Sequence, residues 1–417
     1  MPMTMAEKIL ARSAGRSTTI AGEIVEAAVN VAMSHENAGM VLHHFKTIGA
    51  SRVWDPERIV IVFDHRIPAE SERTATTHKT IREFVRAQGI RNFYDINVGI
   101  CHQVLPEHGH SRPGELLVGT DSHTTTHGAF GCFGTGIGAT EMACVWATGK
   151  LWLRVPETIR IEVTGQFPAF VSAKDLVLYV IGKLGADGAD YKAVEYAGPT
   201  IDAMTIASRM VLSNLSMEMG AKVAFVEPDE KTVRYVRERT DVPFEPIFPD
   251  RDAKYVQTLK VDVSTLRPQI ACPHAVDNVK PIDEVGEVKV NQALLGSCTN
   301  GRLEDLQVAA SILRGRKVHP ETRMLVIPAS WAIYEEAMKA GLLFDLIGAG
   351  AVICNPGCGP CLGVHQGILA PGERCISSTN RNFQGRMGSP EAEVYLGSPA
   401  VVAASAVAGR IIDPEKL

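Results

Sequence analysis

Three cysteines lie close together late in the sequence. Cys354, Cys358 and Cys361 fall within eight residues, and Gly357 and Pro360 stand between them. Glycine and proline at these places allow the backbone to wrap around a metal and to turn its amides toward sulfur ligands. The spacing leaves four interpretations open: a zinc site, an iron–sulfur cluster, a redox dithiol, and a tight turn whose thiols are incidental.

A further cysteine, Cys298, stands in the segment GSCTN (296–300), between a predicted strand and a predicted helix. A thiolate at a helix N-terminus is stabilised by the helix dipole and by free amides, and this cysteine would supply the fourth ligand of a zinc site. The alternative is a buried loop cysteine beside Thr299 or Asn300 as the helix N-cap.

Several histidines stand close to carboxylates in the sequence. Asp64 and His65 are neighbours, Asp121 and His123 are two residues apart, and His102 lies between these two pairs. A carboxylate fixes the tautomer of a nearby histidine and holds its proton ready, which suits general acid catalysis. The alternative is a set of polar residues in surface turns.

Two arginines, Arg381 and Arg386, share one short predicted loop. They could clamp carboxylates through forked hydrogen bonds, unless the loop is simply a solvated turn. Ser122 precedes His123 but does not stand in a G-x-S-x-G elbow, and the glycine-rich run 134–138 lacks the spacing of a nucleotide loop. Together these residues describe a metal or cluster site beside acid-held histidines, which suits Lewis-acid chemistry on a small polycarboxylate.

The composition excludes several classes of protein. The chain has 417 residues, 45% of them hydrophobic and 21% charged, so it folds into globular domains. A net charge of −5 without a basic tract argues against binding to nucleic acid. The longest apolar stretch, 399–409, is too short to span a membrane, and the first residues do not read as a secretory signal, so a cytoplasmic protein is expected. Nine cysteines argue against a disulfide framework.

Short apolar runs end where the reactive residues begin. We expect buried parallel strands at 58–63, 116–119, 159–163, 292–296, 324–327 and 351–354. We expect helices at 6–32, 77–87, 173–184, 202–215, 303–314 and 330–340, with a glycine-rich loop and helix at 128–148. This alternation predicts three α/β domains, at 1–152, 153–280 and 281–417, with the site at the C-terminal ends of strands.

The motifs, in their order, resemble the aconitase superfamily, and most closely the large subunits of 3-isopropylmalate dehydratase and homoaconitase. The matching segments are MAEKILARSAG (5–15), FDHRIP (63–68), GTDSHT (119–124), GSCTNGRLEDL (296–306), CNPGCGPCLG (354–363) and STNRNFQGR (378–386). The resemblance implies three α/β domains packed around a central [4Fe–4S] cluster. By motif, Cys298, Cys358 and Cys361 would hold the cluster and leave one iron open to substrate, while Cys354 would not be a ligand.

The resemblance also implies carboxylate–histidine pairs with catalytic roles. These pairs would be Asp64 with His65, Asp121 with His102, and Glu218 with His123. In this scheme His65 would protonate the departing hydroxyl group.

The same resemblance suggests which residues lie near the substrate. Arg381 and Arg386 would bind a substrate carboxylate, and Asn380 would orient the cluster side. Ser122 would contact the substrate or its hydrogen-bond network. Asn214 belongs to a segment (214–218) that is similar to the family's site segment in the second domain.

Two departures from the family pattern stand out. His35 agrees with the His-Asp-x-Thr/Ser pattern of isopropylmalate dehydratases, but Glu36 and Ala38 do not, which leaves open whether that loop contacts the substrate. The chain also ends at Leu417, before the swivelling fourth domain that supplies a serine base in one-chain members. The resemblance therefore implies a separate small subunit that carries this base, and a large subunit that is inactive alone.

The function implied is that of a hydro-lyase. It would convert 2-isopropylmalate to 3-isopropylmalate in leucine biosynthesis by dehydration and rehydration, and homocitrate, 2,3-dimethylmalate and maleate are alternative substrate classes. Two non-enzymatic alternatives are an RNA-binding protein, against which the net charge counts, and a zinc-stabilised structural subunit.

Overall fold

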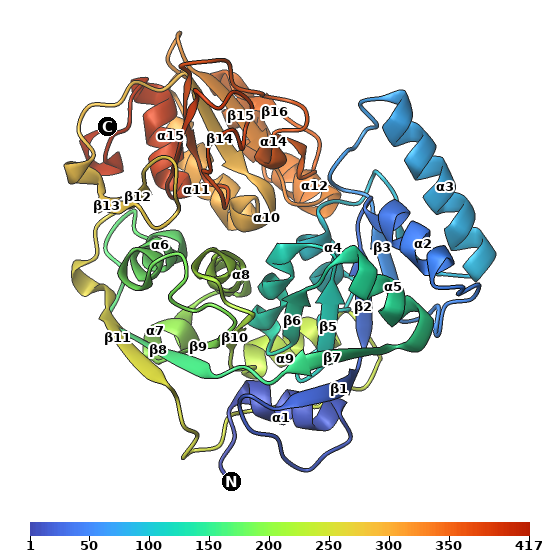
Figure 1. Ribbon diagram of the computed structural model, residues 1–417. Helices are drawn as coiled ribbons and strands as arrows, with labels where there is room; N and C mark the ends of the chain where they lie inside the picture. The colour runs from blue at the N-terminus through green and yellow to red at the C-terminus, as the bar shows by residue number, and fades with distance from the viewer.

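The strands form a five-stranded, a four-stranded and a seven-stranded sheet and a separate two-stranded ribbon. The structure is a computed structural model that describes residues 1–417. Helices lie against each of the three larger sheets (Figure 1). The α/β class predicted from the sequence is confirmed. The strands expected at 58–63, 116–119 and 292–296 are present, as is the helix expected at 173–184.

The five-stranded sheet has the order β4-β3-β2-β5-β6, and all its pairs are parallel. Its strands are β2 (Val31–Ser34), β3 (Ile59–Val62), β4 (Asn92–Tyr94), β5 (Leu116–Gly119) and β6 (Phe133–Gly136). Its helices are α1 (Met5–Ser13), α2 (Ala38–Thr47), α3 (Glu72–Gln88), α4 (Cys101–Glu107), the 3-10 helix η1 (Ser122–Phe130) and α5 (Ala139–Thr148). Every residue of β2, β3 and β5 is buried, as expected for central parallel strands covered on both faces.

The helix expected over 6–32 is wrong beyond Ser13. The chain leaves α1 through Gly15, which has a positive φ of 65°, and then forms β1 (Ile24–Ala28). In β1 the buried residues alternate with exposed ones, and the strand pairs with β7 (Lys150–Arg154) in an antiparallel ribbon. The buried positions Val25 and Ala27 follow a period of two, which the mixed spacing of apolar residues did not separate from a helical period.

The four-stranded sheet has the order β10-β9-β8-β11 and is also parallel. Its strands are β8 (Thr158–Thr164), β9 (Ala193–Ala197), β10 (Val223–Val226) and β11 (Gln257–Asp262). Its helices are α6 (Ala173–Leu184), α7 (Pro199–Ala203), α8 (Ile206–Leu215), η2 (Ser216–Met219) and α9 (Glu230–Arg237), with η3 (Val263–Thr265) after β11. The single helix expected at 202–215 is split, because Met204 is extended and Thr205 caps a new helix by accepting a hydrogen bond from the Ser208 amide.

The seven-stranded sheet has the order β13-β12-β18-β17-β14-β15-β16, with parallel pairs from β18 to β16 and antiparallel pairs at β12. Its strands are β12 (Gln269–Ala271), β13 (Val279–Pro281), β14 (Gln292–Gly296), β15 (Arg323–Ile327), β16 (Val352–Ile353), β17 (Arg374–Ser377) and β18 (Glu393–Leu396). Its helices are η4 (Ile282–Glu284), α10 (Ser297–Asn300), α11 (Leu303–Leu313), α12 (Trp331–Lys339), α13 (Leu342–Ala349), α14 (Gly359–Leu362), α15 (Pro399–Ala408) and η5 (Pro414–Lys416). Because β12 already belongs to this sheet, the sheet begins before residue 280, and the three-domain division at 152 and 280 stays a prediction.

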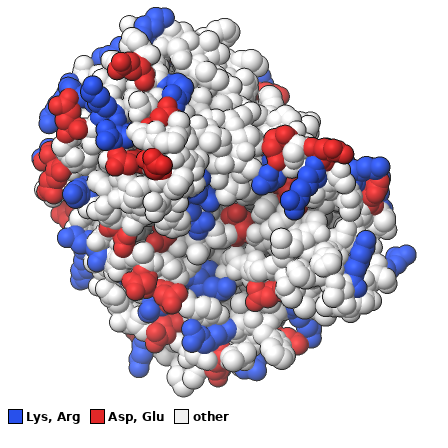
Figure 2. Space-filling model, turned by 45° about the horizontal axis from the view of Figure 1, so that its top comes forward, with Lys and Arg blue, Asp and Glu red and all other residues white.

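The outer surface carries both signs of charge. On the face drawn in Figure 2, acidic and basic side chains are interspersed rather than gathered by sign. No helix is both long enough and apolar enough to cross a membrane.

Gly128 allows the first and second sheets to approach each other through η1. A Cβ atom at Gly128 would lie 1.8 Å from the carbonyl oxygen of Ala224 on β10, which is backbone and cannot move aside easily. We expect Gly128→Ala to lower the free energy of unfolding by about 1–3 kcal/mol or more, measured by denaturant titration. Gly348→Ala is the matched control, since nothing lies within 4 Å of its Cβ position and its φ is not positive. Equal stability of the two variants would contradict this account.

Candidate active site

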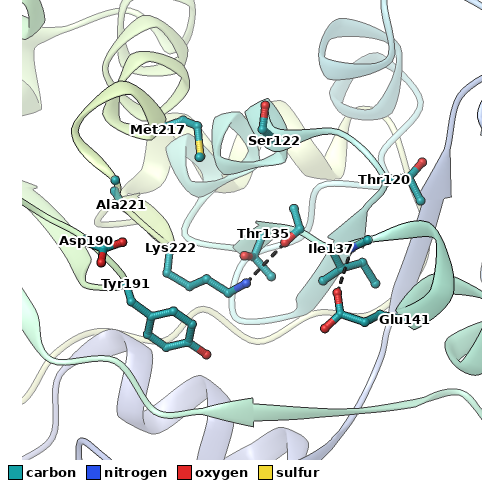
Figure 3. Close-up of a pocket in the computed structure, with 13 residues that line it drawn as sticks. Thr120, Ser122, Thr135, Ile137, Glu141, Asp190, Tyr191, Met217, Ala221 and Lys222 are labelled. Atoms are coloured by element: carbon teal, nitrogen blue, oxygen red, sulfur yellow. Dashed lines mark hydrogen bonds between the residues drawn. The ribbon is translucent and has the colours of Figure 1, made fainter. Parts of the chain in front are cut away.

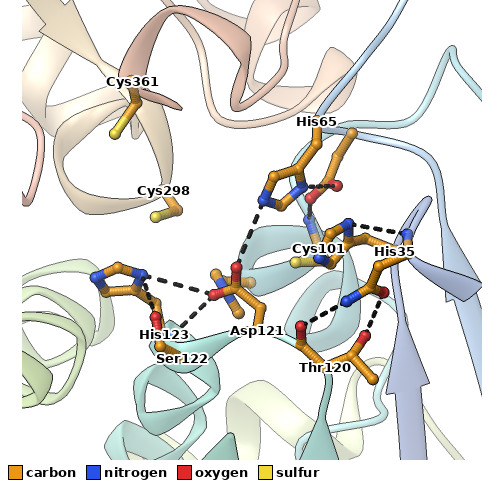
Figure 4. Close-up of polar contacts among 12 residues, drawn as sticks. His35, His65, Cys101, Thr120, Asp121, Ser122, His123, Cys298 and Cys361 are labelled. Atoms are coloured by element: carbon orange, nitrogen blue, oxygen red, sulfur yellow. Dashed lines mark hydrogen bonds and ion pairs between the residues drawn. The ribbon is translucent and has the colours of Figure 1, made fainter. Parts of the chain in front are cut away.

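The reactive residues follow the C-terminal ends of parallel strands. Asp64 and His65 follow β3, Asp121 and His123 follow β5, and Cys298 follows β14. In Figure 1, α4, α8 and α10 come together near the centre of the molecule, and α10 contacts both α4 and α8. Residues from the three sheets therefore face one site, and Figure 4 shows Cys298 and Cys361 at the upper left, His123 below Cys298, and His65 and His35 to their right.

His65 lies between two carboxylates. Its Nδ1 is 2.5 Å from Asp64 Oδ1, and its Nε2 is 3.4 Å from Asp121 Oδ2. The other oxygen of Asp64 accepts the backbone N–H of Cys101 at 2.7 Å, which fixes the carboxylate at the start of α4. Burial alone would lower the pKa of His65, but the charge of Asp64 and the hydrogen bonds to Asp121 and Asp64 raise it well above its ordinary value. These contacts favour the protonated form of the His65 ring.

Asp121 connects all three histidines. Its Oδ1 lies 2.8 Å from His102 Nε2 and accepts the backbone N–H of His123 at 2.8 Å, while its Oδ2 faces His65. Burial would raise the pKa of Asp121, but the charge of His102 and hydrogen bonds with the histidines hold it well below its ordinary value. The carboxylate stays negative at neutral pH and couples the positions of the histidine rings.

Glu218 pairs with His123 across the boundary between the first and second sheets. Its Oε1 is 2.7 Å from His123 Nε2 and accepts Arg381 Nε at 2.8 Å. Burial would raise the pKa of Glu218 and lower that of His123, but the hydrogen bonds joining this pair, and for His123 the bond to Asp121, shift both pKa values toward the charged forms. Arg381 also donates to Ser122 Oγ at 3.0 Å. The structure thus brings together all three carboxylate–histidine pairs, and their catalytic roles stay predictions.

Amide side chains surround the thiols. Asn214 Nδ2 and Asn380 Nδ2 lie 3.4 and 3.6 Å from Cys298 Sγ, and the Cys361 thiol donates to Asn380 Oδ1 at 3.2 Å. A hydrogen bond from the Cys358 thiol holds the pKa of Cys361 well below its ordinary value. The three thiols predicted as ligands therefore meet at one place, with amide donors for a sulfur-rich group. This donor set fits an iron–sulfur cluster.

Cys354 lies outside this group. It packs in an apolar core beside residues such as Leu294 and Ile327, and its backbone amide donates to Val326 in continuation of the sheet. Burial raises the pKa of its thiol. Asn214 and Asn380, whose amides contact the thiols of Cys298 and Cys361, make no hydrogen bond with the Cys354 thiol.

The sequence did not predict the roles of two buried basic residues near the thiols, Arg302 and Lys174. Arg302 donates to the carbonyl oxygens of Cys298 and Thr299 at 2.7 Å each, and to the Gln103 side chain at 2.9 Å. Lys174 donates to the carbonyl oxygens of the two residues before Asn380, and burial lowers its pKa to about 7. Both cations hold backbone segments that carry site residues. Apart from the Gln103 side chain, the partners named here are main-chain atoms, so no residue spacing marks them.

Arg386 keeps part of its guanidinium group free. Its Nε donates to the carbonyl oxygen of Cys361 at 3.0 Å, and its two terminal nitrogens make no hydrogen bond within the chain. Arg381, in contrast, uses its guanidinium group on Glu218 and Ser122. Arg381 keeps only Nη1 without a hydrogen-bond partner, so Arg386 has more of its guanidinium group available to bind a carboxylate.

A pocket of about 350 Å³ lies beside Ser122, and residues 135–138 of the glycine-rich run line it (Figure 3). The amide of Gly138 at the start of α5 donates to Glu141, and the carbonyl of Gly136 accepts Lys222 Nζ. The N-terminus of α5 is therefore already occupied by a carboxylate and does not form a phosphate loop. None of the three histidines lines this pocket, so it is not the centre of the site.

Comparison with known proteins gives one consistent family. The model of the aconitase family (aconitate hydratase) matches residues 7–289 and 283–409. The chain is 57% identical, over the full length of both chains, to a probable 3-isopropylmalate dehydratase large subunit of Methanothermobacter thermautotrophicus. It is 55% identical to the 3-isopropylmalate dehydratase large subunit 1 of Methanopyrus kandleri, over 99% of each chain. It is also 52% identical to a probable methanogen homoaconitase large subunit of M. thermautotrophicus, over 99% of this chain and 98% of the relative.

Proposed function

Because the chain belongs to the aconitase family, we propose that it is the large, cluster-bearing subunit of a hydro-lyase that converts 2-isopropylmalate to 3-isopropylmalate. The reaction removes water from a hydroxy acid and adds it back at the neighbouring carbon. The observation that carries the proposal is the convergence of three carboxylate–histidine pairs on three thiols at one site. A cytoplasmic step of leucine biosynthesis is the corresponding role.

The cofactor proposed is a [4Fe–4S] cluster held by Cys298, Cys358 and Cys361. When bound, it would supply Lewis-acid chemistry through the one iron that has no cysteine ligand. Asn214 and Asn380 would donate hydrogen bonds to its sulfur ligands, while Arg302 and Lys174 would fix the backbone of the segments that carry or flank them.

The proton of the leaving group is assigned to His65. As the C–O bond of the substrate breaks, His65 gives its proton to the departing hydroxyl group, which leaves as water. Asp64 and Asp121 hold the ring on both sides, so it stays charged and oriented until the transfer. On rehydration the neutral ring takes the proton back from the entering water molecule.

Arg386 is proposed to bind a carboxylate of the substrate. A charge-assisted pair of this kind contributes about 1.5–3 kcal/mol, so Arg386→Lys should raise KM by about 10- to 100-fold and change kcat less. Steady-state kinetics of the assembled enzyme measure this. Arg374→Lys is the control, because Arg374 pairs with Glu393 at the exposed start of β17. An unchanged KM in Arg386→Lys would remove Arg386 from the substrate site.

The base that removes the proton from carbon is proposed to come from a small subunit. The relatives are named large subunits, which supports a partner chain, and the assembly would be a heterodimer or heterotetramer. Neither nucleic acid nor a membrane is a proposed partner.

The test is reconstitution with defined partners. The chain, purified without oxygen, is combined in turn with the small subunit of a 3-isopropylmalate dehydratase and with that of a homoaconitase, and each mixture is offered 2-isopropylmalate, homocitrate and 2,3-dimethylmalate. We expect conversion of 2-isopropylmalate with the first partner. Homoaconitase activity is the second candidate, supported by the 52% identical relative. If cluster-loaded mixtures convert no hydroxy acid, the proposed function is wrong.

A further inference from the structure

Glu36 has an unusual set of partners for a buried carboxylate. Its Oε1 accepts the backbone N–H groups of Asp64, His65 and Arg66 at 3.1, 3.0 and 2.9 Å, and its Oε2 accepts the His65 N–H at 3.1 Å. The residue is 7% exposed. One carboxylate therefore satisfies three consecutive amides of the segment that carries His65.

The placement of Glu36 follows from the sheet. Glu36 stands two residues after β2, and Asp64 stands two residues after β3, the strand that pairs with β2 in parallel. These amides have left the strand ladder, and without Glu36 those of the buried residues Asp64 and His65 would be donors lacking a partner, each at a cost of about 1–3 kcal/mol. The carboxylate thus ties together the ends of two neighbouring strands at the edge where the site lies.

The histidines around Glu36 strengthen the same arrangement. The ring of His35 stacks on that of His65 with centroids 3.9 Å apart, and His35 Nδ1 is 3.6 Å from Glu36. His78 Nε2 lies 3.8 Å from Glu36 Oε1 and makes no hydrogen bond. The anchored backbone of residues 64–66 and the stacked ring of His35 therefore both hold the His65 ring in place.

A metal ion is the competing interpretation of this cluster. Ligand atoms of His35, Glu36, Asp64 and His65 lie within 4.8 Å of one another. However, Glu36 Oε1 already accepts three amides, and the two oxygens of Asp64 are used by the His65 ring and the Cys101 amide. Because the carboxylate oxygens already accept hydrogen bonds, the arrangement favours a role for Glu36 in holding the backbone of residues 64–66 over a metal site.

We propose that Glu36 is a positioning residue for His65, acting through the backbone of residues 64–66 without touching the substrate. This inference rests on the proposed function only for its effect on rate. It also gives a role to Glu36, one of the two residues at which the sequence departs from the family pattern. Its carboxylate binds the backbone that follows β3.

The experiment compares Glu36→Gln and Glu36→Asp with Glu70→Gln in the cluster-loaded large subunit joined to its small subunit. Glu70 accepts hydrogen bonds from Arg66 and Thr74 side chains but holds no amide of 64–66, so it is the matched control. Two quantities are measured: amide hydrogen exchange of a peptide spanning 63–67, by mass spectrometry, and kcat with KM. Iron and sulfide content monitors the integrity of the site.

In Glu36→Gln we expect faster exchange confined to that peptide, a kcat lower by about 10- to 100-fold, a KM changed less than about threefold, and an unchanged cluster content. Glu36→Asp keeps the charge and should recover part of both effects. Unchanged exchange in Glu36→Gln, or faster exchange with a normal kcat, would overturn the proposal. If Glu36→Gln does not fold, Glu36→Asp decides by the same criteria. Should no mixture show activity, the proposed function fails, while the exchange data still decide whether Glu36 anchors the segment.

Discussion

Replacing His65 by glutamine is expected to lower kcat by about 10²- to 10⁴-fold, the usual contribution of a general acid. The ring of His65 lies between the carboxylates of Asp64 and Asp121, at 2.5 and 3.4 Å. Glutamine keeps hydrogen-bonding capacity but carries no proton to give. Steady-state kinetics of the assembled enzyme measure the effect, and iron and sulfide content should stay at the value of the unchanged protein.

The controls for this prediction are a remote histidine and the pH profile. His43→Gln changes an exposed histidine of α2 and should leave kcat within about twofold. Because the pKa of His65 is raised, its acid form persists above the ordinary histidine range, and activity should be lost only as the pH rises through the raised value. Asp64→Asn removes the strongest interaction that raises this pKa, so the alkaline limit should move to lower pH. A His65→Gln variant of normal kcat would show that another group protonates the leaving hydroxyl.

Replacing Cys358 by serine is expected to abolish the cluster and, with it, the activity. Serine offers a hard hydroxyl in place of a thiolate and binds iron of a cluster poorly. Cys358 interacts directly with Cys361, so its loss also leaves that thiol without its partner. The measurement is iron and acid-labile sulfide per chain in protein purified without oxygen.

Cys354→Ser is the matched control for the cysteine prediction. Both cysteines stand in the same eight-residue segment, but Cys354 packs in an apolar core, and its amide belongs to the sheet. We expect this variant to keep its iron and sulfide and to lose only a little stability from a buried hydroxyl. A cluster retained in Cys358→Ser, or lost only in Cys354→Ser, would overturn the ligand assignment.

The sequence predicted the α/β class and the chemistry at the strand ends, because both depend on local signals. Apolar runs such as 59–62 and 116–119 stop at Asp64 and Asp121, and parallel strands place these residues at one edge. The local pattern of apolar residues failed where it fitted a helical period and a strand period equally well. Residues 14–32 read as helix, but Ile24–Ala28 pairs with β7 as a separate ribbon and Val31 begins β2, and only the pairing decides that.

The long-range part of the site could not be derived from spacing. His123 and Glu218 are 95 positions apart, and only the resemblance paired them. The roles of Arg302, Lys174 and Glu36 could not be predicted for a different reason. Each binds backbone atoms of another segment, so its role depends on how two strand ends or loops meet in space. Charged residues with such partners look like ordinary surface residues in a sequence.

The central claim is that three cysteines of this chain hold a cluster used in dehydration. Iron, zinc and acid-labile sulfide per chain, determined together in protein purified without oxygen, test it most directly. The account predicts iron and sulfide each near the four per chain of a [4Fe–4S] cluster, a brown colour and little zinc. About one zinc per chain without sulfide, in a colourless protein, would contradict it, because the same thiols would then hold a structural metal instead.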